Sequence, residues 1–125
     1  MGEGVRFRLV ASGFFVLALT AAAPAHAAEK RCGWIQNPTP ANWFFVDRQG
    51  EWELSVQGGY QAPGLDELPD LTTKHWIVTN GSSYGYGCAC IRADTDRRSK
   101  RVTRLISLVQ QPIYVCRRDK QLGKP

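Results

Sequence analysis

The sequence predicts a mainly β domain, antiparallel, with two hairpins, at most one short helix and a disulfide framework; an α+β fold is the alternative. First, residues 51–57 alternate apolar Trp52 and Leu54 with polar side chains, which is the period of a half-buried strand. Second, Cys88 and Cys90 lie two positions apart in a strand-like run, so both side chains face one side. Third, four cysteines in a short chain are typical of a small stapled domain.

The N-terminal residues 1–27 are predicted to be a signal peptide. Arg6 and Arg8 supply a positive start, an apolar run follows, and Ala25-His26-Ala27 fits a small-x-small cleavage site. The apolar run is short and rich in alanine for a membrane span. Cleavage leaves residues 28–125, enough for one exported domain. We therefore expect a periplasmic or secreted protein with no transmembrane segment in the mature chain.

The charges of the mature chain are unevenly distributed. Residues 28–88 hold four Lys or Arg and seven Asp or Glu, whereas residues 89–125 hold ten and three. Such a basic C-terminal third suits an anionic envelope component or an acidic protein surface, or it is a solvated face with no partner. Its densest cluster includes Arg97, Arg98 and Arg101 but no aromatic residue for base stacking, so no nucleic-acid partner is expected.

The first half of the domain contains the first predicted hairpin. Arg31 to Trp34 opens the domain, and Asn37-Pro38-Thr39-Pro40 is predicted to be a loop because proline lacks a backbone donor. Residues 42–47 are rich in aromatic and β-branched side chains, which favours a strand. Arg48-Gln49-Gly50 then forms the turn into the alternating strand 51–57.

A Gly-rich connection and a short helix are predicted next. Residues 58–64 form an irregular loop. Asp70 is a candidate N-cap, and a helix is predicted over 71–79 with Asn80-Gly81 as its end. Residues 76–79 also have strand propensity, which leaves the alternative of a strand.

The second hairpin occupies the C-terminal third. Residues 84–92 and 102–109 are predicted strands joined by a polar turn, and Pro112 ends the second strand. Residues 113–116 are predicted as a last short strand or an extended arm, and residues 117–125 as a frayed end.

The four cysteines allow three pairings. Cys88 with Cys90 is the poorest, because their Cα atoms lie about 6.6–6.8 Å apart on one strand and their Cβ vectors run parallel. Cys32 would then pair with one of them and Cys116 with the other, in either combination. Metal binding or thiol exchange by Cys88-Ala89-Cys90 is the less favoured alternative, since the sequence has no Cys-x-x-Cys spacing and its only methionine is the initiator.

Catalytic chemistry has few candidate residues. His75 is the only histidine after the predicted cleavage site, which disfavours a nucleophile–histidine pair or a zinc site. Glu51, Glu53, Asp66 and Asp70 could supply the two carboxylates of a small hydrolase. A solvated face is the simpler interpretation of these residues, and we expect no cofactor and no metal.

Tyrosines next to glycines are the candidate binding residues. Tyr84 and Tyr86 precede Cys88 in the run Tyr-Gly-Tyr-Gly, and Tyr60 follows Gly58-Gly59. Exposed tyrosine suits a binding surface, although packing on a sheet explains these rings equally well. In the binding interpretation, Arg97, Arg98 and Arg101 would steer an anionic partner.

The chain resembles an uncharacterised family of small exported bacterial proteins, classed as a domain of unknown function. The resemblance covers about residues 30 to 120. Its motifs are Arg31-Cys32-Gly33-Trp34, Asn37-Pro38-Thr39-Pro40-Ala41-Asn42-Trp43, Gly50-Glu51-Trp52, Gln57-Gly58-Gly59-Tyr60, Thr79-Asn80-Gly81, Tyr84 to Cys90 and Cys116-Arg117-Arg118-Asp119. The family implies export and small size, and it supplies no activity or catalytic residue.

These observations favour a non-enzymatic exported binding protein whose partner is an envelope component or another protein. An inhibitor-like or immunity-like role is one form of this hypothesis. A small carboxylate-dependent hydrolase and a structural envelope protein are the alternatives.

Overall fold

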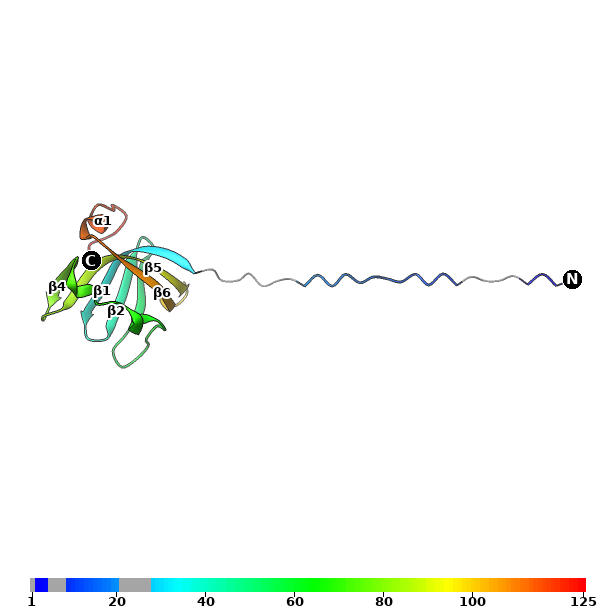
Figure 1. The fold of residues 1–125 in the computed structure, drawn as a ribbon, viewed down its shortest axis with the longest axis horizontal. Coiled ribbons are helices and arrows are strands. Elements are labelled where there is room, and N and C mark those ends of the chain that lie inside the picture. Colours follow the sequence, from blue (N-terminus) through cyan, green and yellow to red (C-terminus); the bar gives the residue numbers. More distant parts are fainter. Residues whose placement is uncertain (1, 5–8, 21–27) are drawn as a thin grey trace.

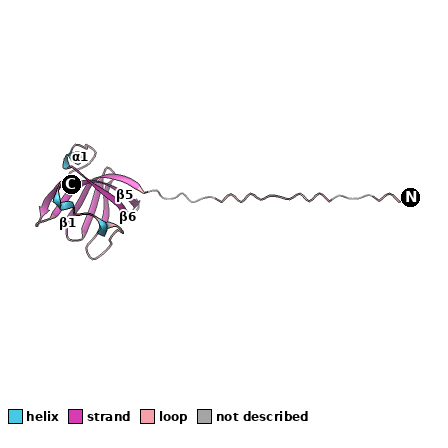
Figure 2. Cartoon of the chain, in the orientation of Figure 1, coloured by secondary structure: helices cyan, strands magenta, loops and turns pink. Residues whose placement is uncertain are grey.

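The computed structural model describes residues 2–4, 9–20 and 28–125, and it confirms a mainly β domain (Figure 2). The strands are β1 (Glu29–Thr39), β2 (Asn42–Asp47), β3 (Gly50–Ser55), β4 (Trp76–Asn80), β5 (Tyr84–Asp96) and β6 (Arg101–Gln111); the helical elements are the 3-10 turns η1 (Leu65–Glu67) and η2 (Leu71–Thr73) and the helix α1 (Ile113–Arg117). Both predicted hairpins, β2–β3 and β5–β6, are present.

Residues 2–4 and 9–20 form no helix or strand, and their side chains are exposed. The folded domain begins at β1 (Figure 1). Arg6, Arg8 and the predicted cleavage site Ala25-His26-Ala27 lie outside the described residues. Among the residues that are described, no helix is long and apolar enough to cross a membrane.

Five strands close into a barrel in the order β1-β2-β3-β6-β5, because β5 pairs back with β1. All neighbouring pairs are antiparallel except β3 and β6, which run parallel. This is the Greek-key connectivity of OB-fold barrels. β4 is an additional strand beside the first residues of β5. Such barrels serve many functions, so the connectivity alone assigns none here.

The joint between β3 and β6 is the weakest part of the barrel wall. Only Glu53 and Arg101 pair there directly. The segment Tyr60–Gly64 fills the remaining gap: Ala62 N donates to Leu54 O at 2.8 Å, and Leu105 N donates to Pro63 O at 2.9 Å. The segment after the Gly-rich turn therefore completes the wall of the barrel.

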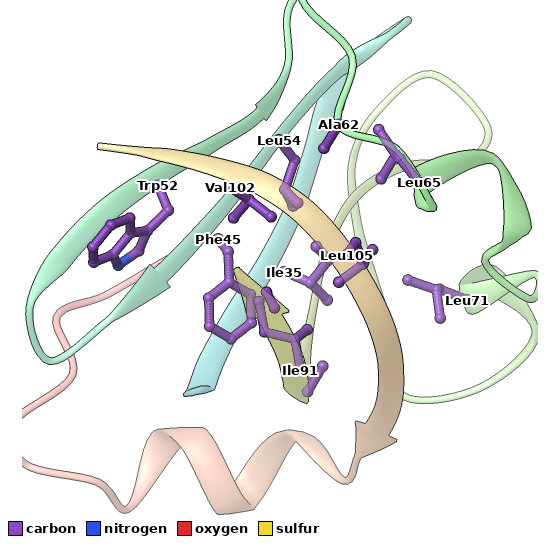
Figure 3. Packing of buried hydrophobic residues seen from close by; sticks show 12 residues of the cluster. Ile35, Phe45, Trp52, Leu54, Ala62, Leu65, Leu71, Ile91, Val102 and Leu105 are labelled. Atoms are coloured by element: carbon purple, nitrogen blue, oxygen red, sulfur yellow. The ribbon is translucent and has the colours of Figure 1, made fainter. Parts of the chain in front are cut away.

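The core lies inside the barrel and is closed at one end by η1 and η2. Figure 3 shows its side chains converging from β1, β2, β3, β5 and β6, with Leu65 and Leu71 at the end covered by the two 3-10 turns. Trp52, Phe45, Ile35 and the other inward residues are essentially inaccessible. Burying large apolar side chains stabilises each by roughly 1.5–3 kcal/mol, so this packing is the main source of stability.

A buried ion pair closes the other end of the barrel. Arg31 Nη1 donates to Asp47 Oδ2 at 2.8 Å, and the indole Nε1 of Trp52 donates to Asp47 Oδ1 at 3.0 Å. The guanidinium of Arg31 also lies over the Trp52 ring, 3.9 Å from its centroid. Because both charges are paired and hydrogen-bonded, their burial is compatible with a stable fold.

The helix predicted over 71–79 is wrong. Its start is as expected, because the carboxylate of Asp70 accepts a hydrogen bond from Thr72 N. The chain leaves the helical conformation after three residues, His75 has φ 53°, and β4 follows. The side-chain amide of Gln110 donates to Leu71 O and Lys74 O, so a distant residue satisfies the carbonyls at this turn.

Three further boundaries differ from the predictions. Residues 113–116 lie in α1, not in a strand, and the helix begins directly after Pro112. Residues 117–125 are not frayed, because Leu122 packs beneath the helix and Gly123 O accepts a hydrogen bond from Trp34. Pro38 lies within β1 and not in a loop, at a position where pairing with β2 is irregular.

Two disulfides join distant segments to β5: Cys32–Cys90 and Cys88–Cys116. Cys88 and Cys90 therefore each bind a different end of the domain, as the strand geometry predicts. Cys32 and Cys90 are direct cross-strand partners of β1 and β5, whereas Cys116 attaches α1 to the outer wall of the barrel.

Candidate binding groove

The outer face of β5 carries the candidate site. Ala89 and Ile91 point into the core, so the alternate residues Tyr86, Cys88 and Cys90 face outward. α1 and the segment that follows it cover part of this face (Figure 1).

A second, small core forms beneath α1. Its buried members are Trp34, Cys88 and Cys116, and Tyr86 packs against it. The rings of Trp34 and Tyr86 meet edge to face with centroids 5.4 Å apart, a favourable geometry for aromatic pairs. The cluster fixes both rings on the outer wall, one from β1 and one from β5.

Two hollows meet at Tyr86 and Pro125, and together we call them the Tyr86 groove. The larger has a volume of about 470 Å³ and the smaller about 200 Å³. The residues lining the larger are Trp34, Tyr86, Cys116, Arg117, Leu122, Gly123, Lys124 and Pro125. Those lining the smaller are Gln36, Pro38, Thr79, Gly85, Tyr86 and Pro125.

The lining of the Tyr86 groove is aromatic and cationic. Trp34 and Tyr86 supply the rings, and Arg117 and Lys124 supply two positive charges. No Asp or Glu side chain lines either hollow. The groove therefore favours an apolar segment that also carries negative charge.

Tyr60 and Arg101, two other predicted site residues, lie together elsewhere. The Arg101 guanidinium stacks 4.0 Å from the Tyr60 ring centroid and forms an ion pair with Glu53 at 2.8 Å. The Tyr60 hydroxyl donates to Val102 O at 2.8 Å. Burial raises the pKa of the Tyr60 hydroxyl above its usual value of 10.0, although Arg101 acts in the opposite direction. These contacts give both residues a structural role at the β3–β6 joint.

Arg97 and Arg98 lie at the tip of the β5–β6 hairpin, far from the tyrosines. Both side chains are exposed, and Arg97 approaches Glu29 at 3.7 Å. Tyr84 and Tyr86 are at the other end of β5, which at about 3.3 Å per residue places them roughly 30 Å away. The predicted steering charges and the predicted tyrosines therefore do not form one site.

Gly58 and Gly59 form an exposed turn after β3. Gly59 N donates to Val56 O at 3.0 Å, and Gly58 has φ 73°, a conformation that favours glycine. No hollow described here is lined by either glycine. Their evident role is to reverse the chain so that Tyr60 can enter the barrel wall.

The four candidate carboxylates of the hydrolase hypothesis are dispersed. Glu53 is paired with Arg101, and Asp70 caps η2, where its hydrogen bonds with Thr72 lower the pKa of the carboxyl. Glu51 and Asp66 are exposed on β3 and η1. None of the four hollows described here is lined by two of these residues.

The outer face of β2 and β3, the ligand-binding face of many OB-fold barrels, carries Glu51 and the ion pair of Glu53 with Arg101 here. Trp52 and Leu54 point inward, so Glu51 and Glu53 point outward.

Sequence reasoning missed most of the groove. Trp34 was named only in the segment that opens the domain and in a family motif, and Arg117 and Lys124 belonged to a segment expected to fray. The cysteine pattern did contain information on this part of the site. A disulfide from Cys116 to β5 places the residues that follow Cys116 on the same face of the barrel as Tyr86. The long-range contact of Trp34 with Gly123 has no local sequence pattern.

The fold and the groove define a small, disulfide-stapled β-barrel with an aromatic hollow on its outer wall. The chain belongs to the family described as a protein of unknown function (DUF4087), whose model matches residues 26–123. This match confirms the resemblance seen in the sequence. No curated protein and no solved structure matches the chain.

Proposed function

We propose that the protein is an exported, non-enzymatic binding protein that holds an extended, acidic segment of another protein in the Tyr86 groove. The observation that carries this proposal is the arrangement of Trp34, Tyr86, Arg117 and Lys124 around one hollow with no acidic side chain in its lining. The partly exposed Tyr86 ring supplies contact area above the buried Trp34 ring, and the two cations favour a carboxylate-bearing partner.

An extended, proline-containing segment suits the groove best. Aromatic-lined grooves bind such segments because proline preorganises them and lowers the entropy cost of ordering. Pro125 of the chain itself lines both hollows, so a proline ring is compatible with this surface. The sheet and the two disulfides fix the rings of the groove before a partner arrives, which reduces the cost of binding.

Export to the periplasm or the medium is part of the proposal. Two disulfides in a small domain are typical of proteins that fold in an oxidising compartment. The predicted signal peptide over residues 1–27 supports the same conclusion. The dispersal of Glu51, Glu53, Asp66 and Asp70 supports binding over hydrolysis.

Synthetic peptides can test this function. The probe is an acidic peptide of about twelve residues with two Asp-Pro pairs, and its controls replace Asp by Lys or Pro by Ala. Fluorescence polarisation should detect binding of the acidic peptide and little binding of the Lys peptide. Tyr86→Ala should weaken that binding by about tenfold, the loss expected for an aromatic contact residue, and Arg117→Glu by a similar factor.

The matched control is Ile106→Ala, which changes an exposed apolar side chain on β6 that does not line the groove. It should leave the affinity unchanged. Equal affinity of the wild-type protein and Tyr86→Ala would contradict the proposed site. Turnover of a glycan or peptide substrate that disappears in Glu53→Gln would contradict the non-enzymatic assignment.

A further inference from the structure

The two disulfides have different surroundings. Cys88 and Cys116 are buried in the small core, with exposed fractions of 1% and 3%. Cys32 is exposed, and its partner Cys90 is half-buried. Only the Cys32–Cys90 bond can therefore be reached by a thiol from solvent without opening the fold.

A hollow lies directly beside Cys32. Its volume is about 370 Å³, and its lining comes from β1, from the turn between β2 and β3 and from the segment after α1. The lining residues are Lys30, Arg31, Cys32, Asp47, Arg48, Gln49 and Asp119. This space can admit a thiol of the size of a short peptide next to the sulfur of Cys32.

The charges around the bond are mainly positive. In the lining, Arg31 is paired with Asp47 and Arg48 with Asp119. Lys30 is the remaining cation of the lining. Arg92 of β5 is not part of the lining, but it is the cross-strand partner of Lys30, two residues along the strands from the Cys32–Cys90 pair. Neither forms an ion pair among the residues that the structure describes. Such cations attract anionic thiols and favour the thiolate form of a released cysteine.

We propose that Cys32–Cys90 is a thiol–disulfide exchange site that accepts an anionic low-molecular-weight thiol at Cys32. The incoming thiolate attacks Sγ of Cys32 from the hollow. A new S–S bond forms between the incoming sulfur and Cys32, the Cys32–Cys90 bond breaks, and its electron pair leaves on Cys90 as a thiolate. The product is a mixed disulfide at Cys32, and Lys30 and Arg92 stabilise the released negative charge.

The barrel retains its other connections when this bond opens. β1 stays paired with β5 over the register from Glu29 to Asn37, and it also pairs with β2. The Cys88–Cys116 bond still fixes α1 to the wall. Exchange at Cys32 can therefore proceed on the folded protein and modify its surface at one position.

Graded reaction of the wild-type protein with two small thiols tests this site. The probes are the anionic 2-mercaptoethanesulfonate and the neutral 2-mercaptoethanol, compared at equal thiolate concentration. After acid quenching and alkylation, peptide mass spectrometry should find the adduct on Cys32 while Cys88–Cys116 is intact and the circular dichroism is unchanged. The anionic thiol should react about threefold faster or more at low salt, and the difference should vanish at about 1 M salt.

Charge variants provide the second readout. Lys30→Glu with Arg92→Glu should abolish the preference for the anionic thiol, whereas Arg98→Glu at the hairpin tip, which does not line the hollow beside Cys32, should retain it. If the double variant does not fold, the salt dependence of the wild-type protein decides the point. Three results would overturn the proposal. The Cys88–Cys116 bond could open before or together with Cys32–Cys90, or the adduct could form on Cys90 in place of Cys32. Equal rates for both thiols at low salt would be the third.

Discussion

The indole Nε1 of Trp34 donates a hydrogen bond to the carbonyl oxygen of Gly123 at 2.9 Å. This contact joins β1 to the C-terminal segment and brings Lys124 and Pro125 into the lining of the Tyr86 groove. One hydrogen bond thus connects the small core beneath α1 with the shape of the proposed binding site.

Trp34→Phe should release the C-terminal segment while it retains a ring in the small core. The lost hydrogen bond and the smaller ring together predict a fall of about 1–3 kcal/mol in the free energy of unfolding, measured with urea. Amide hydrogen exchange should accelerate at residues 122–124. Trp43→Phe is the control, since Trp43 packs against the main core and does not line the groove. Acceleration in both variants would contradict the assigned role of Trp34.

Gly33→Ala should strongly destabilise the barrel. A Cβ atom at Gly33 would lie 2.0 Å from the carbonyl oxygen of Val46, so β1 and β2 would have to separate. Overpacking of this kind costs about 1–3 kcal/mol or more, and backbone relief is unavailable within a paired sheet. Gly123→Ala is the matched control, because a Cβ at Gly123 would meet nothing within 4 Å. Similar urea midpoints for the two variants would show that the close approach of the strands is unimportant.

The arginines of the C-terminal third should separate into structural and solvated groups. Arg101→Ala removes an ion pair with Glu53 and the stacking on Tyr60, both partly exposed, and should cost about 1–2 kcal/mol. Arg97→Glu with Arg98→Glu should change stability by less than about 0.5 kcal/mol, because both side chains are exposed. Thermal melting of the two variants checks which substitution destabilises the fold more. A larger loss of stability in the hairpin-tip variant than in Arg101→Ala would contradict the assignment of Arg101 as structural and of Arg97 and Arg98 as solvated.

Acid should loosen the C-terminal segment at Asp119. A hydrogen bond from Gln121 N and another from Arg48 lower the pKa of the Asp119 carboxyl below its usual value of 3.8. Because the pKa in the folded state is the lower one, the carboxylate stabilises the fold above pH 3.8, and this contribution is lost as the pH falls through the lowered value. Carboxyl NMR titration should give a lower pKa for Asp119 in the native protein than in urea. An equal or higher native pKa would contradict the contacts described.

The parts of the fold with strong local patterns were predictable. The alternation around Trp52 and the pair Cys88 and Cys90 predicted a stapled, antiparallel β domain, and the structure confirms both. The exclusion of a Cys88–Cys90 bond followed from strand geometry alone, and the observed pairs agree with it.

The segments that were predicted wrongly depend on distant partners. Residues 71–79 have a good helix start at Asp70, but Gln110 satisfies the carbonyls of Leu71 and Lys74 from 36 to 39 residues away, and β4 then pairs with β5. Residues 113–116 have β-branched side chains that favour a strand, yet Pro112 and the bond from Cys116 to Cys88 place them in a helix on the outer wall.

The candidate site was predictable only in part, for the same reason. Tyr86 was identified from the Tyr-Gly-Tyr-Gly run, and it is the one predicted tyrosine that lines the groove. Tyr60 came from a similar aromatic–glycine pattern, but the gap between β3 and β6 gives its ring a structural position. No local sequence pattern distinguishes Tyr60 from Tyr86. Their different roles depend on the strand pairing around each ring, which is set by distant parts of the chain.

Chemical-shift mapping tests the central claim most directly. The ¹⁵N-labelled protein would be titrated with the acidic Asp-Pro peptide, and the indole Nε1–H signal of each tryptophan followed with the backbone amides. We predict the largest shifts at the Trp34 indole and at the amides of Thr79, Gly85 and Tyr86. Shifts confined to the hairpin tip at 97–100 or to residues 58–64 would contradict the proposal that the Tyr86 groove is the binding site.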